Sequence, residues 1–352
     1  MNREKKLRAV VTQFGVSFVL RKNKRQTILA IPFLFCYNSS TKGRIEYNSG
    51  KGVYMTKRQF MEQVTGKLKE LHSESDYEIS CDVFTKNNDT PRYGIVIQKA
   101  GEAISPTIYV DNYFKDYVDK KMTLTEVAEQ IIAVLQNVRK HASKYESFSV
   151  EYDSCKPNIV YRLISFEKNK RLLQEVPYIP FLNLAVTFSI VCSLSEQGLE
   201  SLRITNDLKD KWQVTTGELV RLAEENTPRL FPPQVDSMEN VLFTYLGLEK
   251  GMFPENTEYG PLLIVTNESG VNGASVLLYQ DVIHDIAEKY GKNLYVLPSS
   301  VHEIIVVPNE NSGSLKELSK MVKDINKKHV SEEEILSDNA YYYDREKRKF
   351  LY

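Results

Sequence analysis

The chain has 352 residues, of which 42% are hydrophobic and 26% charged, and its formal net charge is zero. This composition is that of an ordinary globular protein and excludes the disordered and fibrous classes. The length is enough for two domains of about 100–200 residues each. No stretch reaches the roughly 18 consecutive apolar residues of a membrane-spanning helix. We therefore expect a soluble protein that makes no contact with a membrane.

The four cysteines predict a reducing compartment. Cys36, Cys81, Cys155 and Cys192 are widely spaced and form neither a C-x-x-C pair nor a cluster with histidine. Zinc sites need ligands at close paired spacings, and disulfide frameworks are typical of shorter secreted chains. The sequence also lacks the glycine-rich nucleotide-binding patterns and the common hydrolase and metalloprotease motifs. We expect a cytoplasmic protein with no metal and no other cofactor.

Residues 1–54 differ from the rest of the chain in charge. They contain 11 Lys and Arg but only two acids, Glu4 and Glu46, whereas the remaining residues carry 35 basic and 44 acidic side chains. Nucleic-acid binding requires a basic footprint. The mildly acidic body of the chain therefore argues against a nucleic-acid partner.

The segment Gly50-Lys51-Gly52 bears on where translation begins. Its codons form a purine-rich string that can be read as a bacterial ribosome-binding site, a few codons before Met55. A predicted helix opens soon after Met55. We expect residues 1–54 to be a mis-translated leader, and the alternative is a disordered basic arm that binds a partner or a membrane surface.

The first domain is expected within residues 55–145, and helices begin and end it. Apolar residues at helical spacing predict a helix over Gln59–Leu71. Thr123 and Glu126 have the spacing of a capping box, which predicts a second helix running to about Lys140.

Three extended segments are predicted between these helices. Residues alternate between apolar and polar over Tyr77–Phe84 and Tyr93–Gln98, which is typical of strands. The third segment, Ile104–Val110, contains Pro106 and so belongs at a sheet edge. The resulting order, α-β-β-β-α, describes a compact α+β domain.

The second domain is expected within residues 146–352, after a polar linker over His141–Pro157. A helix is predicted around Ile159–Gln174. The segment Phe181–Leu194 is nearly all apolar, and its periodicity does not distinguish a buried strand from a buried helix. A short strand is predicted over Leu202–Thr205.

The last third of the chain gives the clearest pattern. Strands are predicted over Leu262–Thr266, Ala274–Tyr279, Leu294–Leu297 and Glu303–Val307. Helices are predicted after the capping residues Thr215, Asp281 and Ser314. Gly270 and Gly273 predict a hairpin turn between the first two strands. The order β-β-α-β-β-α favours an antiparallel sheet with helices on one face, so the fold class is α+β: two domains with mainly antiparallel sheets and helices packed on them.

The segment after Pro298 contains the candidate catalytic residues. In an extended chain Ser300 and His302 would project from the same face, and a serine–histidine pair can form an activated nucleophile. Ser299 and Glu303 are the other candidates, although Glu303 would point the other way. Such a pair also needs an orienting group and an oxyanion site. Proline followed by two hydroxyl residues instead favours a structural turn, in which at least one serine bonds nearby backbone.

A tyrosine-rich segment near the end of the chain is the candidate binding surface. Tyr341, Tyr342, Tyr343, Asp344 and Arg345 combine aromatic rings with charge, as recognition surfaces do. The same pattern is typical of a strand with one packed face and one wet face, and that structural interpretation is the one we prefer.

Five segments of the chain carry a family resemblance. They are Ile104–Tyr109, Val160–Ile164, Glu225–Leu230, Leu297–Glu303 and Leu336–Arg345. In these segments the chain resembles an uncharacterised family of bacterial proteins, a domain of unknown function common in anaerobic Gram-positive bacteria. The resemblance implies no activity, cofactor or catalytic residue.

Two hypotheses for function follow. The first is a non-enzymatic protein that binds or regulates a macromolecular partner, and we expect that partner to be a protein. The second is a hydrolase that uses Ser300 and His302. Catalysis requires a concave site in which the Ser300 hydroxyl lies near a base and near donors for an oxyanion, whereas a loop with bonded side chains favours binding.

Overall fold

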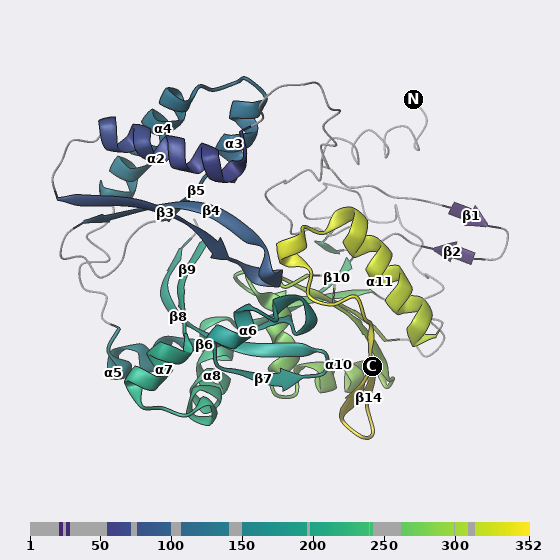
Figure 1. Cartoon of the computed structure of the whole chain (residues 1–352). Coiled ribbons are helices and arrows are strands. Elements are labelled where there is room, and N and C mark those ends of the chain that lie inside the picture. Colours follow the sequence, from purple (N-terminus) through teal and green to yellow (C-terminus); the bar gives the residue numbers. More distant parts are fainter. Residues whose placement is uncertain are drawn as a thin grey trace. The chain divides into compact units, whose positions relative to one another are not determined.

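A computed structural model shows how the chain folds (Figure 1). It describes residues 21–23, 26–28, 55–71, 76–99, 107–140, 150–195, 198–238, 240–241, 262–298, 300–308 and 314–352. The chain divides into two compact units: an N-terminal unit within 43–155 and a C-terminal unit within 156–352, to which 1–42 are assigned. Apart from the antiparallel pair β1 (Arg21–Asn23) and β2 (Gln26–Ile28), the predicted leader lies outside the described residues.

The N-terminal unit is a three-stranded antiparallel sheet with helices on one face (Figure 1). Its strands, in the order in which they pair, are β3 (Tyr77–Thr85), β4 (Pro91–Lys99) and β5 (Thr107–Tyr109). Its helices are α2 (Lys57–Leu71), α3 (Asp111–Val118) and α4 (Leu124–Lys140). The predicted order is confirmed, β5 lies at an edge as expected, and only α3 was not predicted.

Side-chain capping explains why α4 begins where it does. The Thr123 backbone N–H donates to Glu126 Oε2 at 2.7 Å, and the Glu126 N–H donates to Thr123 Oγ1 at 3.3 Å. These reciprocal bonds satisfy two donors that a helix start leaves unpaired. The bonds to Thr123 also hold the pKa of Glu126 below its usual value.

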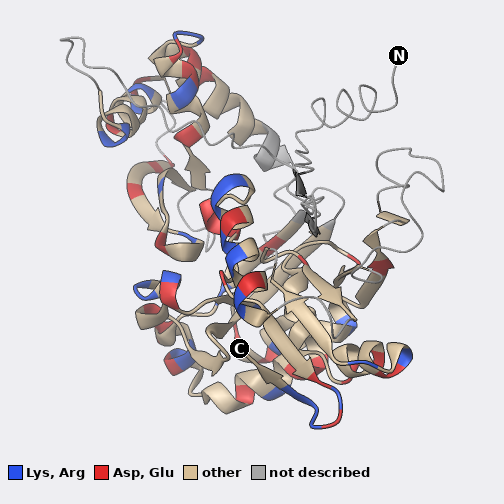
Figure 2. Ribbon diagram, turned by 90° about the vertical axis from the view of Figure 1, so that its right-hand side faces the viewer, with Lys and Arg blue, Asp and Glu red and all other residues tan. Residues whose placement is uncertain are grey.

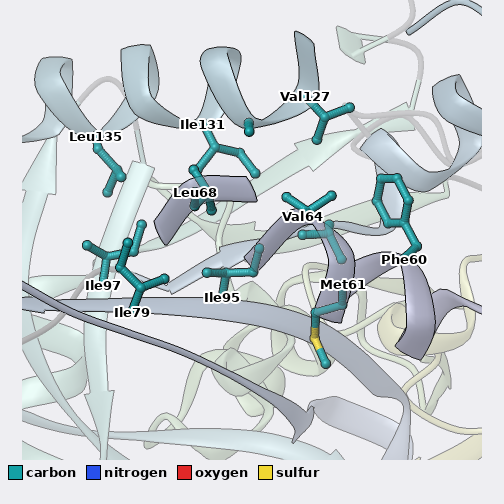
Figure 3. Close-up of a cluster of buried hydrophobic side chains, with 12 residues drawn as sticks. Phe60, Met61, Val64, Leu68, Ile79, Ile95, Ile97, Val127, Ile131 and Leu135 are labelled. Carbon is teal, nitrogen blue, oxygen red and sulfur yellow. The ribbon is translucent and has the colours of Figure 1, made fainter. Parts of the chain in front are cut away.

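The core of the N-terminal unit lies between α2, α4 and the sheet (Figure 3). Phe60, Val64 and Leu68 project from α2 at helical spacing and are fully buried against Ile131 of α4 and Ile95 of β4. Burial of one such side chain contributes roughly 1.5–3 kcal/mol. The apolar stripe of α2 therefore fixes the helix on the sheet.

The C-terminal unit contains a six-stranded antiparallel sheet. In spatial order its strands are β10 (Pro233–Ser237), β11 (Leu263–Asn267), β13 (Ile304–Val307), β12 (Leu294–Leu297), β14 (Tyr341–Asp344) and β15 (Lys349–Leu351). All residues of β11, β12 and β13 are buried. Both faces of the sheet are therefore covered, although a single helical layer was predicted.

Two helices cover the two faces of this sheet. On one face Leu318 and Val322 of α11 (Leu315–His329) pack with Tyr295, Tyr342 and their neighbours. On the other face the ring of His284, from α10 (Val282–Tyr290), lies 6.4 Å from that of Tyr343. Tyr342 and Tyr343 point to opposite faces because side chains alternate along a strand.

A second antiparallel sheet completes this unit. Its strands are β6 (Ile159–Ser165), β7 (Tyr178–Phe181), β8 (Leu184–Ser195) and β9 (Gly198–Arg203). The long strand β8 pairs with each of the other three. On the edge of β6 that faces away from β8, the Tyr161 N–H donates to Thr227 Oγ1 at 3.1 Å and the Leu163 N–H donates to Ser275 Oγ at 3.3 Å. Thr227 belongs to α8 (Thr216–Leu230), and these bonds occupy edge donors that would otherwise be buried unpaired.

The helix predicted around Ile159–Gln174 is wrong. Residues 159–165 form β6, and the 3₁₀ turn η4 (Glu167–Asn169) and the short helix α6 (Leu172–Glu175) follow. Every β6 residue except Arg162 is buried. A strand buried on both faces is apolar throughout, so its sequence lacks the alternation that would have identified it.

The strand predicted over Ala274–Tyr279 is also wrong. These residues belong to the 3₁₀ helix η5 (Gly273–Leu278), and the turn before it therefore joins a strand to a helix. The helix after Asp281 is confirmed, but Asp281 has a φ of 64° and its side chain does not cap the helix. Asp281 Oδ1 instead accepts a bond from Arg348 Nη2 at 2.6 Å.

The α+β class with mainly antiparallel sheets is confirmed. Charged residues lie mainly on helices and loops, and the strands are largely free of them (Figure 2). No helix within the described ranges is both long and apolar enough to cross a bilayer. The predicted linker lies partly outside the described residues, and its end forms α5 (Tyr152–Cys155) and the 3₁₀ turn η3 (Lys156–Asn158).

Candidate functional site

The predicted catalytic segment is the connection between β12 and β13, which pair with each other as expected. It is a closed turn in which the Ser300 N–H donates to the Glu303 carbonyl at 3.3 Å. Ser299 lies outside the described residues. Because the chain turns here, the alternation expected for an extended segment does not apply.

The Ser300 hydroxyl is committed to the turn itself. The residue is fully buried, and its Oγ donates to Glu303 Oε1 at 2.9 Å and accepts the His302 N–H at 3.0 Å. A nucleophilic serine needs a base that takes its proton and space for an acyl group beside it. Here the hydroxyl bonds a carboxylate and a backbone amide, so the geometry favours a structural role.

His302 makes a different set of contacts. Its Nδ1 accepts the Asn272 backbone N–H at 3.3 Å, and its Nε2 lies 3.9 Å from Glu334 Oε1. Burial lowers the pKa of His302 and outweighs the opposing effects of Glu334 and of a hydrogen bond to Gly270, while Arg162 lowers the pKa further. The ring is therefore neutral at pH 7, and it joins the turn to the loop before η5.

The predicted tyrosine surface is mostly internal. Tyr341 is fully buried and donates from its hydroxyl to Asn183 Oδ1 at 2.6 Å, and Tyr343 is buried against Phe350 at a centroid distance of 4.9 Å. Tyr342 is half-buried. Burial leaves Tyr341 and Tyr343 no open face for a partner and agrees with the packed-strand interpretation.

The two charged members of the segment lie beside the β14–β15 turn. Asp344 Oδ1 accepts the Lys347 N–H at 2.9 Å, and Asp344 Oδ2 pairs with Lys347 Nζ at 2.8 Å. Arg345 Nη1 lies 3.3 Å from Glu288 Oε1 of α10. Both side chains therefore already have local partners, and neither points to a ligand.

Sequence reasoning missed a recess beside the outer edge of β6. Its walls come from β6, β9, α8 and the loop before η5, and its cavity volume is about 10 Å³, which is roughly the space of one water molecule. Pockets that bind drug-sized ligands have volumes of roughly 300–1,000 Å³. The recess is therefore smaller than a typical small-molecule site.

Arg162 is the charged residue of this recess. Its Nη2 donates to Ser201 Oγ of β9, and its Nε is buried with no hydrogen-bond partner. Burial, together with repulsion from Arg203, lowers the pKa of Arg162 to about 10. The guanidinium therefore remains charged at pH 7. A single arginine within an apolar strand forms no recognisable sequence motif, so the sequence alone did not identify Arg162 as a candidate.

Within the described part of the chain, no three His, Cys, Asp or Glu side chains come together as a possible metal site. His284 Nε2 lies 3.8 Å from Glu288 Oε1, as expected for residues one turn apart on α10.

Comparison with known proteins places the chain in a family. The model of a family of unknown function (DUF5688) matches residues 57–345, which is most of the sequence. The chain belongs to this family. No curated protein and no solved structure matches it. The predicted resemblance to a family without assigned function is confirmed.

Proposed function

We propose that this is a non-enzymatic cytoplasmic protein that binds another protein through the edge of its six-stranded sheet. The proposal rests on the exposed side chain of the edge strand β15. Leu351 on this strand is 52% exposed and lies opposite half-buried Tyr342 of β14. Tyr342 in turn lies beside Tyr295, at a ring-centroid distance of 5.3 Å.

This row of side chains continues the apolar layer under α11 to the sheet edge. Tyr295 and Tyr342 both belong to the cluster that α11 covers. β15 pairs with β14 on one side, and no other described strand pairs with it. An open strand edge offers backbone donors and acceptors to a partner strand, and its exposed apolar side chains give specificity.

The contacts of Ser300 support a protein without hydrolase activity. Its hydroxyl is buried and bonded to Glu303, and the His302 ring is bonded elsewhere. The widely spaced cysteines support a reducing cytoplasmic location. The mildly acidic body after residue 54 supports a protein over a nucleic acid as the partner.

Co-purification from the native host tests the proposal. Leu351→Asp places a charge in the proposed contact and should reduce recovery of the partner at least about tenfold, as loss of a buried apolar anchor does. Lys327→Asp is the matched control, because it places the same side chain at an exposed position of α11. Equal recovery with all three proteins, or no specific partner with the wild type, would refute this contact surface.

The hydrolase alternative has its own test. Ser300→Ala removes the donor to Glu303 and the acceptor of the His302 N–H, so we expect it to lower the free energy of unfolding by about 1–3 kcal/mol. A serine-directed fluorophosphonate probe should not label the wild-type protein. Labelling that maps to Ser299 or Ser300, and that disappears in His302→Ala, would establish the hydrolase instead.

A further inference from the structure

The ring of His302 connects the turn after β12 to the loop before η5, which consists of residues 268–272. The Asn272 backbone N–H donates to His302 Nδ1 at 3.3 Å, and the ring also forms a hydrogen bond with the backbone of Gly270. Only a ring nitrogen without a proton accepts such a bond. The contact with Asn272 therefore depends on the protonation state of His302.

The other hydrogen bonds at the tip of this loop are internal. Ser269 Oγ donates to Asn267 Oδ1 at 2.8 Å and accepts the Val271 N–H at 3.2 Å, and the Gly270 N–H donates to the Asn267 carbonyl at 3.0 Å. Among the described residues, the bond between Gly270 and His302 is the only one that links 269–271 to a segment outside the loop and Asn267. The ring of His302 is therefore the main attachment of the loop tip.

The backbone of the loop is strained. Asn272 has a φ of 52°, and Gly270 has a φ of 66°. This left-handed region is unfavourable for a residue with a Cβ atom, such as Asn272. A strained segment keeps its conformation only while the surrounding contacts hold it. Loss of the bonds to His302 would therefore favour a different conformation of the loop.

The charged groups around the ring come from three elements. Glu334 of η6 (Glu332–Glu334) has its Oε1 3.9 Å from His302 Nε2 and raises the pKa of the ring, whereas Arg162 of β6 lowers it. Glu303, in the same turn as His302, bonds the Ser300 hydroxyl. Burial has the largest effect and keeps the pKa of His302 below its ordinary value. Glu334 is thus the carboxylate that a charged ring would meet.

A proton on Nδ1 would set two donors against each other, the ring N–H of His302 and the backbone N–H of Asn272. A ring that is released from the loop and remains beside Glu334 accepts a proton more readily than the ring bonded to the loop. Protons therefore bind preferentially to the released state. Its population rises as the pH falls below about 6.5, the ordinary histidine value, and stops rising once the bonded ring is also protonated.

We propose that His302 is a pH-sensitive latch, whose neutral ring holds residues 268–272 closed and whose protonated ring releases them. Val271 and Asn272 line the small recess beside β6, so release of the loop opens this recess. The latch lies within the C-terminal unit and does not depend on the protein contact proposed at β15.

The first test follows the full-length wild-type protein by NMR from about pH 7.5 to about pH 5.5. At the higher pH the ring ¹⁵N signals of His302 should show a proton on Nε2 and none on Nδ1. As the pH falls, the ring and the Asn272 amide should shift with one midpoint. The amides of 270–272 should also lose protection from hydrogen exchange, corrected for the intrinsic effect of pH, while those of β11 and β13 keep it.

Three outcomes of this test would overturn the proposal. They are a proton on Nδ1 at neutral pH, an Asn272 amide that does not respond when His302 titrates, and a ring that stays neutral down to the pH at which the protein unfolds. None of them requires a substitution, so the test holds even if a variant fails to fold.

Substitutions connect the response to the ring. His302→Asn places a carbonyl oxygen, which does not titrate, near the position of Nδ1 and should abolish the pH response of the loop. His329→Asn is the matched control, because it makes the same replacement at an exposed position of α11, and it should leave the response intact. Glu334→Gln removes the charge beside Nε2 and should move the midpoint to lower pH. A response that survives in His302→Asn, or an unchanged midpoint in Glu334→Gln, would overturn the proposal.

Opening of the recess has its own measurement. The methyl signals of Val271 should be broadened more strongly by a soluble gadolinium chelate at about pH 5.5 than at about pH 7.5, because release of the loop exposes this side chain. His302→Asn should show equal broadening at both pH values. Equal broadening in the wild type would show that the recess stays covered and would overturn its opening by the latch.

Discussion

Replacing Gly273 by alanine should destabilise the C-terminal unit by about 3 kcal/mol or more. A Cβ atom at this position would overlap Thr266 Oγ1 and the His302 carbonyl oxygen and would lie 2.9 Å from the Asn267 backbone nitrogen. Two of these three atoms belong to the backbone and cannot rotate away. Thr266 Oγ1 also donates to the His302 carbonyl at 2.7 Å, so the clash falls where β11, η5 and the Ser300 turn meet.

Urea denaturation measures this effect, with Gly217→Ala as the control. Gly217 lies in the first turn of α8, and its nearest neighbour would be Thr215 Oγ1 at an ordinary 3.8 Å. Alanine is preferred over glycine in a helix, so the control should be neutral or stabilising by up to about 1 kcal/mol. A Gly273→Ala protein as stable as the wild type would show that the three segments separate easily.

Helices with local start signals were predictable from the sequence. The capping box of Ser314 and Glu317 is present, with the Ser314 N–H donating to Glu317 Oε2 at 3.0 Å and the Glu317 N–H donating to Ser314 Oγ at 3.3 Å. Thr215 likewise accepts the Glu218 N–H at 3.1 Å at the start of α8. These bonds join residues three positions apart, so the local sequence contains all the information they require.

Strands of the second sheet were harder to predict because their environment is not local. β6 and β8 are buried by elements distant in the chain, and Arg162 of β6 meets Ser201 of β9 across 39 positions. The period of apolar residues along a sequence identifies a strand or a helix only when one of its faces is buried and the other is exposed. The apolar run of β6 was therefore assigned to a helix, and that of β8 was left open between the two.

The turn that contains the candidate catalytic residues Ser300 and His302 was predicted from the sequence only in part. Pro298 and the two serines correctly predicted a connection between paired strands with a hydroxyl bonded to backbone. The expectation that Glu303 points away assumed an extended chain. In the turn its carboxylate instead meets the Ser300 hydroxyl at 2.9 Å.

Replacing Phe60 by alanine should lower the stability of the N-terminal unit by about 3–5 kcal/mol, the usual cost of removing a fully buried phenylalanine. Its ring lies 5.3 Å from that of Phe114 and 5.1 Å from that of Tyr117, measured between centroids. It joins α2 to α3 and leaves a cavity when removed. That loss is a large part of the roughly 5–15 kcal/mol that stabilises a typical domain.

Hydrogen exchange tests this loss together with the predicted division into domains at residues 145 and 146. In Phe60→Ala, amides of β3 and β4 should lose protection while those of β11 and β13 keep it, because the two units have separate cores. Leu71→Ala is the matched control: Leu71 ends the same helix but is 44% exposed, so its truncation should change stability by less than about 0.5 kcal/mol. If protection in β11 and β13 fell together with that in β3 and β4, the chain would unfold as one cooperative unit, and the two-domain prediction would be wrong.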